Sequence, residues 1–442
     1  MAIPHSAAAI RREKIKSVIR LATGNCLEMY DFMIFGYFAA AIGRVFFPKS
    51  SEFASLMFSL ATFGAGFLMR PLGGILLGGY IDKHGRRRGL LLTLALMSVG
   101  TVSIAVTPGW GTIGIAAPLI VLAGRLVQGF SAGAELGGVS VYLAEIATPG
   151  RKGFYVSWQS ASQQLAVFVA ALSGVALHQF LSPQEADDWG WRLPLIAGSL
   201  MIPALFLIRR SLAETEEFQR RKHHPAIGEI LQTLAANWRI VLAGTLMVTM
   251  STVAFYLITA YTPTYGRSAL RLTESDALII TLCVGMSNFI WLPVMGSLSD
   301  RLGRTPMLIA FTAAGILTAY PALAWMAANV SFSGLLAVEL WLSFLYSGYN
   351  GAMIVYLTEI MPINVRASGF SLAYSLATAL FGGSTPMIAT YLIRATADKA
   401  IPGAWLSIAA AIGLGATLWS RTISGSAVSA GRGFTPGSSA SL

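Results

Sequence analysis

A short Gly/Asp/Arg turn occurs twice in this chain, and each copy separates two long apolar runs. The copies read GGYIDKHGR from Gly78 and GSLSDRLGR from Gly296. A polar turn between two bilayer-length stretches, repeated in the second part of the chain, is typical of membrane proteins built from two related halves. The duplication therefore predicts a transporter.

Apolar runs of about 20 residues recur along the whole sequence. With 55% hydrophobic and only 12% charged residues, a soluble chain of 442 residues would leave a large apolar excess facing water. Runs bounded by charges, Pro or Gly fall at about 17–39, 54–79, 88–107, 113–137, 154–180, 191–209, 240–263, 275–297, 305–327, 333–357, 368–393 and 402–420. We therefore predict an all-α membrane protein with twelve transmembrane helices, surrounded by lipid.

Basic residues collect in short segments between these runs. A nucleic-acid-binding protein would gather its positive charge, here +11, on one face, so we expect no nucleic-acid partner. Lys and Arg are roughly threefold more abundant in one alternate set of loops and tails than in the other, which by the positive-inside rule predicts that both termini are cytoplasmic. The N-terminus lacks a cleavage pattern and should be retained.

The longest polar stretch divides six runs from six. We predict a cytoplasmic N-terminus at 1–16, a first six-helix bundle at 17–210, a cytoplasmic central loop at 211–238, a second six-helix bundle at 239–422 and a disordered cytoplasmic tail at 423–442. The two cysteines, Cys26 and Cys283, lie inside apolar runs, so we expect neither a disulfide nor a zinc site, and no cofactor.

Polar residues in the first run mark a predicted proton site, because a charge in the bilayer costs roughly 2.5–3.5 kcal/mol. Asn25, Glu28 and Asp31 are spaced i, i+3, i+6, which we interpret as one stripe facing a cavity. Two close carboxylates make one of them easier to protonate, so Glu28 and Asp31 are candidate proton carriers, and Glu135 in the fourth run is another. A structural hydrogen-bond ladder is the alternative.

Two arginines also lie within runs. Arg125 falls about 12 residues, or roughly 18 Å, from the predicted outer end of the fourth run, close to the middle of the bilayer. Its fork of donors suits a carboxylate, which could belong to an anionic substrate or, alternatively, to the acids of the first run. Arg70 in the second run could assist it, or could extend its charge to the membrane surface.

Uncharged polar groups complete the predicted binding site. Gln159 and Gln163 are spaced i, i+4 in the fifth run, and Asn288, Tyr349 and Asn350 lie in the second half of the chain. We expect these to orient the ligand, with helix–helix hydrogen bonding as the alternative. We assign every acid inside the runs, and both deep arginines, to the first half, so the sequence predicts charge recognition there and hydroxyl or shape recognition opposite.

The repeat extends beyond the turn and carries a family resemblance. YLAE at 142–145 is echoed by YLTE at 356–359, and GRLVQG occupies 124–129. The turn resembles the defining loop of the major facilitator superfamily, and GRLVQG is similar to its fourth-helix motif. This resemblance implies two six-helix bundles. We interpret the turn residues and their acidic partners as gating latches between the bundles: Asp82, Arg86, Glu145, Asp300, Arg304 and Glu359.

Longer matches resemble one branch of that superfamily, the metabolite:proton symporters. They are GNCLEMYDF at 24–32, GFSAGAELGG at 129–138 and SWQSASQQ at 157–164. Within the branch the chain is similar to bacterial citrate:proton symporters and tricarballylate permeases. The resemblance implies alternating-access uptake of a tricarboxylate, citrate ahead of tricarballylate, with protons, by a monomer in the bacterial inner membrane. Sodium as the coupling ion, another organic acid or osmolyte, and proton-coupled efflux stay open as alternatives.

Enzymatic readings find little support. GFSAG at 129–133 matches the nucleophile elbow of hydrolases, but that elbow needs a strand before it, whereas Ser131 lies inside a predicted membrane helix. No phosphate-binding GxxxxGK[ST] loop occurs, so we expect an ion gradient to supply the energy.

Overall fold

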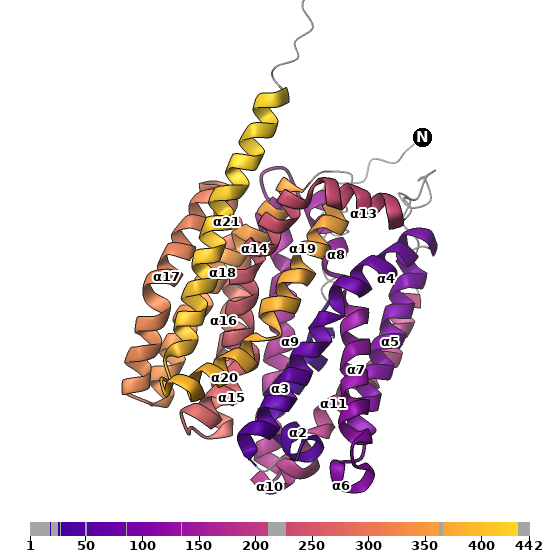
Figure 1. The fold of residues 1–442 in the computed structure, drawn as a ribbon, viewed down its shortest axis with the longest axis vertical. Coiled ribbons are helices and arrows are strands. Elements are labelled where there is room, and N and C mark those ends of the chain that lie inside the picture. The colour runs from indigo at the N-terminus through magenta and orange to yellow at the C-terminus, as the bar shows by residue number, and fades with distance from the viewer. Residues whose placement is uncertain are drawn as a thin grey trace, which may run out of the picture.

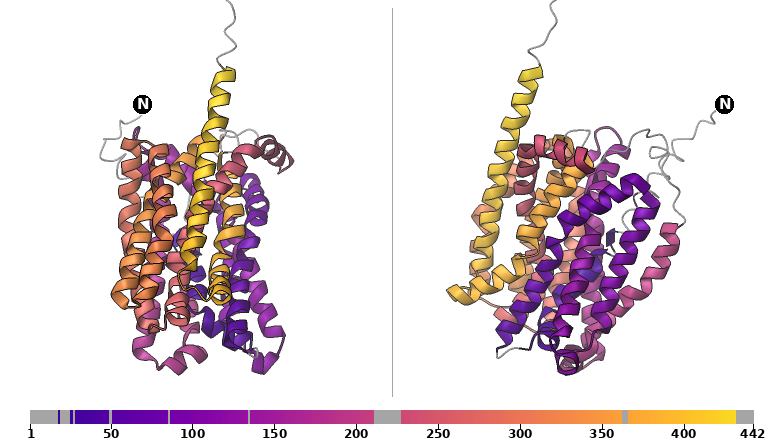
Figure 2. Two further views of the ribbon diagram at one scale, coloured as in Figure 1. Left: turned by 60° about the vertical axis from the view of Figure 1, so that its left-hand side comes forward. Right: turned by 45° about the vertical axis from the view of Figure 1, so that its right-hand side comes forward.

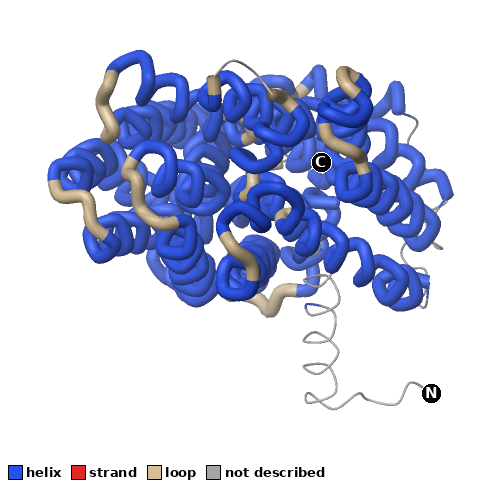
Figure 3. The backbone as a smooth tube through the Cα atoms, turned by 90° about the horizontal axis from the view of Figure 1, so that it is seen from below, coloured by secondary structure: helices blue, strands red, loops and turns tan. Residues whose placement is uncertain are grey.

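Helices make up the regular structure of the described chain. The computed structural model describes residues 18, 25–26, 28–48, 51–84, 86–133, 135–210, 227–361 and 366–431, and no strand occurs within these ranges. Figure 3, a view along the helices, shows helical segments in blue joined by short tan loops. The all-α prediction is therefore confirmed.

The first half of the chain starts with a bent pair. A helix at Glu28–Tyr37 meets α2 (Ala39–Phe46) at 70°. The elements that follow are α3 (Glu52–Leu68), α4 (Arg70–His84), α5 (Arg86–Val106), α6 (Trp110–Ile113), α7 (Ala116–Ala132), α8 (Glu135–Ile146), α9 (Lys152–Phe180), α10 (Pro183–Glu185), η1 (Ala186–Gly190) and α11 (Arg192–Arg210).

The second half has the same character. Its elements are α13 (Ile227–Ala236), α14 (Trp238–Tyr256), η2 (Leu257–Tyr261), α15 (Thr262–Thr264), η3 (Tyr265–Ala269), α16 (Glu274–Leu302), α17 (Arg304–Ala328), α18 (Phe332–Ile360), α19 (Arg366–Ala377), η5 (Thr378–Gly382), α20 (Thr385–Thr396) and α21 (Ile401–Gly431). Side-chain caps fix two helix starts: Thr273 accepts from the Asp276 amide and Ser331 from the Gly334 amide.

Each of the twelve apolar runs coincides with helix over the residues that the structure describes. In the described residues, seven helical stretches are long and apolar enough to cross a membrane, or eight if the bent pair counts as one span, and Leu91–Val106 and Ala116–Ala132 are shorter apolar helices. Several predicted spans are interrupted. The second consists of α3 and α4, the fourth of α7 and α8, and the eleventh of α19, η5 and α20.

The helices form two side-by-side groups. Figure 1 shows α3, α4, α5 and α7 on one side and α16, α17, α18 and α21 on the other. The second copy of the duplicated turn and α13 lie at one end of the molecule, which we name the turn end; α2, α6 and α10 lie at the opposite, far end. Gly303 forms that turn with φ of 91°, a conformation that glycine adopts readily.

The groups meet along α9 and α16. Near the turn end their backbones almost touch, since a Cβ on Gly153 would lie 2.2 Å from the Gly296 carbonyl oxygen. A second close approach joins α3 and α7, where a Cβ on Gly129 would lie 1.6 Å from the Gly66 carbonyl oxygen. This close glycine contact draws α7 against α3.

Two predicted boundaries differ from the structure. α21 continues to Gly431, so the tail predicted as disordered from 423 begins as helix, and Figure 2 shows α21 projecting past its neighbours. The predicted central loop contains α13, an amphipathic helix that contacts both α14 and α4. Short apolar periodicity at 227–236 can form a helix once a partner covers it, which composition alone does not reveal. Residues 211–226 lie outside the described chain.

Candidate functional site

Two buried arginines of the first half pack against a cluster of aromatic rings. Arg70 is 1% exposed and Arg125 is fully buried. Both guanidinium groups lie over the ring of Phe32, at 4.9 and 4.4 Å from its centre. Phe67 also faces Arg70, while Phe63 also faces Arg125. Aromatic faces attract cations and exclude water, so they hold two like charges together without neutralising either.

Arg125 is tied into a relay within the first half. Its Nη1 donates to Oε1 of Gln128 at 2.9 Å and its Nη2 to the Phe63 carbonyl at 3.3 Å. Gln128 donates in turn to the hydroxyl of Thr101, which donates to the Asp31 carboxylate. The predicted link between Arg125 and an acid of the first run therefore exists, but two intervening side chains carry it. Gln128 was missed, although its i, i+3 spacing from Arg125 was a readable signal.

Arg70 is held more loosely. Its Nη2 lies 3.7 Å from Oε1 of Glu28, within ion-pair range but too long for a good hydrogen bond. Neither Nε nor Nη2 of Arg70 has a hydrogen-bond acceptor among the described residues. Arg70 is thus the cation of the pair with more bonding capacity left for a ligand.

The polar residues of the first run do not form one stripe. Asn25 donates to the Gln159 carbonyl of α9, Glu28 faces Arg70 of α4, and Asp31 accepts from Thr101 of α5. At 3.6 residues per turn, positions i and i+6 lie about 120° apart around a helix. Asn25 and Asp31 therefore face different neighbours, and the interpretation of a single cavity-facing stripe is wrong.

Amides of α9 connect the first run to the second half. Gln163 donates weakly to Oδ1 of Asn25, at 3.4 Å. One residue further on, Oε1 of Gln164 accepts from Nδ2 of Asn288 in α16, at 3.1 Å. Asn288 also accepts from Ser343 and Ser347 of α18, so it joins three helices across the interface. Its bonds are largely used by the protein.

The two predicted site residues on α18, Tyr349 and Asn350, make different contacts. The Tyr349 hydroxyl donates to the Met247 carbonyl at 2.8 Å, inside the second half. Oδ1 of Asn350 accepts from Ser251 at 2.6 Å, but its Nδ2 has no described acceptor. Asn350 therefore retains a donor for a ligand, whereas the tyrosine hydroxyl bonds a neighbouring helix.

Three tyrosines of the second half close the space between these groups. Tyr256 packs its ring on Phe67 at 5.1 Å and lies within electrostatic range of both buried arginines. Tyr374 is also near Arg70, and Tyr346 stands beside Gln164. All three are buried. They place the arginines, the α9 amides and α18 around one central region.

Six buried N–H donors of this region have no acceptor in the described part of the chain. They belong to five side chains and comprise Arg70 Nε and Nη2, Arg125 Nε, Gln159 Nε2, Gln164 Nε2 and Asn350 Nδ2. An unsatisfied buried donor costs roughly 1–3 kcal/mol, and more when it is charged. Such a set, all donors and partly cationic, matches a ligand that is rich in carboxylate oxygens.

The turn end is latched across the two halves. Asp300 of α16 accepts from the backbone amides of Gly153 and Phe154, at 2.8 and 3.0 Å, at the start of α9. Arg304 pairs with Asp300 at 2.8 Å and with Glu359 at 3.4 Å. The second copy of the predicted latch is therefore assembled. Its unforeseen partner is a helix N-terminus, which favours a carboxylate.

The first copy of the latch is only partly described. The side chains of Asp82 and Arg86, and that of the proton-site candidate Glu135, lie outside the described residues. Glu145 is exposed at the end of α8. The roles predicted for these four residues remain predictions.

Ion pairs that the sequence did not reveal join the halves at the far end. Asp187 of η1 lies 2.5 Å from Arg44 and 3.0 Å from Arg267, which belongs to the second half. Arg267 also contacts Glu274 at 2.6 Å, and His178 of α9 contacts Glu274 at 3.4 Å. These residues stand near helix ends in no repeated motif. Both ends of the interface are thus bridged while the central groups are buried, as in an occluded state.

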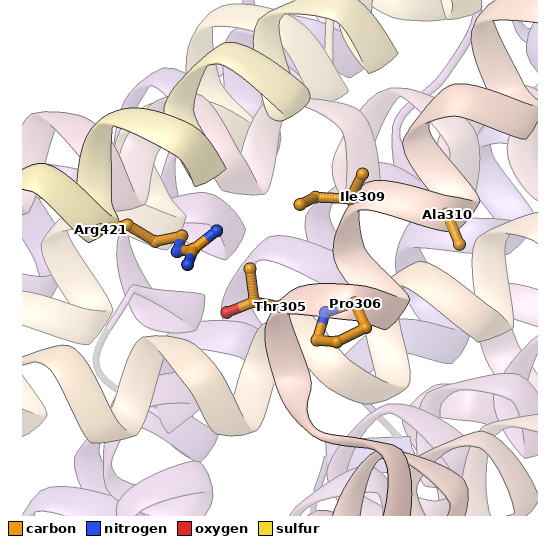
Figure 4. A pocket seen from close by; sticks show the side chains of 5 residues that line it. All are labelled: Thr305, Pro306, Ile309, Ala310 and Arg421. Atoms are coloured by element: carbon orange, nitrogen blue, oxygen red, sulfur yellow. The ribbon is translucent and has the colours of Figure 1, made fainter.

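Two remaining predictions, on the GFSAG motif and on the acids inside the membrane helices, can be compared with the structure. Ser131 lies inside α7 and donates to the Thr93 carbonyl, which is not the strand-to-helix position of a nucleophile. Glu339 of α18 is buried, so the prediction that the membrane acids belong to the first half is wrong. A pocket of about 430 Å³ between α17 and α21 is lined by Thr305, Pro306, Ile309, Ala310 and Arg421 (Figure 4), and none of these residues belongs to the central groups.

Two helical halves that enclose buried charges and are bridged at both ends define a class of protein, the secondary transporters that work by alternating access. The family model described as Major Facilitator Superfamily matches residues 21–386. The chain therefore belongs to the major facilitator superfamily, and it is a multi-pass transporter of the inner membrane, not an enzyme.

Individual proteins similar to this chain include two citrate-proton symporters and a D-xylose-proton symporter of known structure. The chain is 59% identical over 406 residues to the citrate-proton symporter of Klebsiella pneumoniae, covering 92% of this chain and 91% of that protein. It is 56% identical over 413 residues to the citrate-proton symporter of Salmonella typhi, covering 93% and 95%. The crystal structure of a D-xylose-proton symporter matches with a TM-score of 0.72 at 19% identity, over 92% of this chain and 97% of that one, and shows the shared fold alone.

Proposed function

We propose that this protein takes up citrate together with protons. The observation that carries the proposal is the set of six buried donors that have no acceptor among the described residues, on Arg70, Arg125, two glutamines and Asn350. A tricarboxylate offers acceptor oxygens on several sides and carries the negative charge that two guanidinium groups attract. The two citrate-proton symporters that share more than half of this sequence support the same ligand.

Arg70 is the main anchor in this proposal. It has the larger number of unsatisfied donors and only a 3.7 Å contact with Glu28, whereas Arg125 is held by Gln128 and the Phe63 carbonyl. Arg125 contributes positive charge and one further donor. Gln159 and Asn350 then orient the ligand from opposite halves, and binding to both draws the halves together. Gln163 and Asn288 bond mainly to the protein and position their neighbours.

Coupling follows from competition for Arg70. Glu28 and a substrate carboxylate both bind the Arg70 guanidinium. Arg70 therefore binds the substrate carboxylate less strongly while it is also paired with ionised Glu28. A proton on Glu28 releases Arg70 to the substrate, and loss of that proton restores the ion pair and expels the substrate. Asp31 communicates with Arg125 through Thr101 and Gln128, so its protonation acts on the second arginine.

Alternating access requires that the two ends open in turn. The Asp300 latch holds the turn end closed, and the Asp187–Arg267 and His178–Glu274 pairs hold the far end closed. From the positive-inside bias we assign the turn end and both termini to the cytoplasm. Substrate then enters after the far end opens, and it leaves after the Asp300 latch breaks. A monomer contains every group this cycle needs.

Tricarballylate is the main rival substrate, since it lacks only the hydroxyl of citrate. Purified protein in sealed vesicles, given labelled citrate with an inward pH gradient, should accumulate it, and excess tricarballylate should compete weakly. A matched inward sodium gradient without a pH gradient should drive no accumulation. Sodium-driven uptake would overturn the ion assignment, stronger transport of tricarballylate would overturn the substrate, and proton-driven export would replace symport by efflux.

A further inference from the structure

Glu339 is a buried carboxyl group that the proposed cycle does not use. It lies in the first third of α18, 3% exposed. Its Oε1 is 3.0 Å from the Thr262 hydroxyl, while its Oε2 has no hydrogen-bond partner in the part of the chain that the structure describes. No Lys, Arg or His in the described chain lies within 4 Å of it. A lone buried carboxylate of this kind is costly unless a proton neutralises it.

We propose that Glu339 is a proton-binding site of the second half, loaded in the occluded state and emptied during each transport cycle. The inference rests on the proposed proton-coupled uptake and extends it. It adds a proton site on the half of the molecule that otherwise offers amides and hydroxyls.

The hydrogen bonds around Thr262 favour the protonated form. The Thr262 hydroxyl is close to two acceptors, Oε1 of Glu339 at 3.0 Å and the Leu257 carbonyl at 3.3 Å, but it has only one hydrogen to donate. If Glu339 is a carboxylate, one acceptor stays unsatisfied. If it is protonated on Oε1, the carboxyl donates to Thr262 and Thr262 donates to Leu257, so both contacts become hydrogen bonds.

The neighbouring groups do not compete for this proton. Tyr265 of η3 is the titratable group within electrostatic range of Glu339, and its hydroxyl donates to the Lys399 carbonyl. Tyr261, whose ring stacks on that of Tyr265, accepts a hydrogen bond from Thr390. Asp398 also acts electrostatically on Tyr265, less strongly than Glu339 does. The proton on Glu339 is therefore controlled by water access and by Thr262.

The position of Glu339 gives the proton a mechanical consequence. Thr262 follows directly on η2, the π-helical segment in which α14 changes its winding, and π segments are common at functional sites. Glu339 precedes Tyr346 by seven residues on α18, which is about 10 Å along the helix. When Glu339 is protonated, its carboxyl donates to Thr262 and Thr262 donates to Leu257, so these hydrogen bonds connect α18 with α15 and η2. When water reaches Glu339, the proton leaves to water, and the carboxylate takes the Thr262 hydrogen away from Leu257.

The test is the number of protons carried per citrate in reconstituted vesicles. Wild-type protein, Glu339→Gln and the control Glu229→Gln on α13 are compared for proton uptake against labelled citrate uptake, and for citrate exchange without a gradient. The amide keeps the shape of the neutral carboxyl. We expect E339Q to exchange citrate within about twofold of wild type while its proton-to-citrate ratio falls by one, and E229Q to match wild type.

An unchanged ratio in E339Q would show that Glu339 is only structural and would overturn the inference while leaving citrate symport intact. Absence of citrate-linked proton uptake in wild-type protein would overturn the proposed function and this inference with it.

If E339Q fails to fold, a hydrophobic carbodiimide added to the wild-type protein gives the same answer. It reacts with a protonated carboxyl, and the carboxyl oxygen adds to the carbodiimide carbon as the proton moves to nitrogen, with rearrangement to a stable N-acylurea. Mass spectrometry should locate the adduct on Glu339, formed more slowly as the pH rises. Modification of Glu28 without Glu339 would overturn the inference.

Discussion

The two halves of this duplicated fold treat charge differently. The first half holds two buried arginines that share the ring of Phe32, with Glu28 beside one and Asp31 linked to the other. The second half presents amides, serines and tyrosines to the same region, and its buried acid, Glu339, bonds a neutral hydroxyl. A fold that began as two similar halves can therefore specialise, with one half recognising the charge of the ligand and the other its shape and hydrogen bonds.

Removal of a buried arginine should have the largest effect on this division. Arg70→Gln should lower citrate uptake by about 100-fold or more, because a buried charge pair is worth roughly 2–5 kcal/mol to binding. Arg70→Lys should recover only part, since an ammonium lacks the planar fork. Initial rates of labelled citrate uptake measure this. Arg239→Gln, at an exposed position on α14, is the control. Near-normal uptake by R70Q would show that residues other than Arg70 recognise the charge of citrate.

Neutralising the acid beside Arg70 should separate accumulation from exchange. Glu28→Gln imitates the protonated acid permanently, so Arg70 stays available to citrate. We expect accumulation under a pH gradient to fall about tenfold or more, while exchange of internal for external citrate persists. Parallel uptake and exchange assays on the same vesicles show the split. If E28Q still accumulates citrate fully, the coupling proton is carried by another group.

Two adjacent residues of the second half sharpen the comparison. Asn350→Ala removes a donor that has no acceptor among the described residues, so KM for citrate should rise about tenfold, the value of roughly one hydrogen bond to a charged group. Tyr349→Phe removes a hydroxyl that donates to the Met247 carbonyl, so it should lower thermal stability and leave KM within about twofold. If KM rises in Y349F and stays unchanged in N350A, Tyr349 and not Asn350 contacts citrate.

The smallest effect is expected at the far end. Asp187→Asn breaks ion pairs to Arg44 and Arg267 that are partly exposed, so they are worth about 1 kcal/mol together, or roughly fivefold in the balance between open and closed states. Hydrogen exchange should increase in 183–190 and 265–274. Asp188→Asn, at the exposed neighbouring position, is the control. Equal exchange in both variants would remove Asp187 from the latch.

Several features could be predicted from the sequence because they are local or repeated. Apolar length predicts the helices, and the duplicated turn predicts that Asp300, Arg304 and Glu359 meet, as they do. The buried positions of Arg70 and Arg125 follow from their places inside apolar runs.

Other features depend on how helices rotate and pack. Which helix faces Asp31 is set by tertiary contacts, so its partner Thr101 was not foreseen. The 120° separation from Asn25 follows from the i, i+6 spacing itself and was overlooked. The far-end pairs join residues that share no motif, so sequence spacing carries no sign of them. Glu339 is a different case, because an acid within the run at 333–357 was visible and was overlooked.

The most direct test of charge recognition by the first half is a structure determined with citrate bound. The account predicts a substrate carboxylate within hydrogen-bonding distance of the Arg70 guanidinium, Asn350 Nδ2 on another oxygen, and Glu28 turned away from the arginine. Citrate carboxylates that contact only residues of the second half, with Arg70 still paired to Glu28, would contradict it.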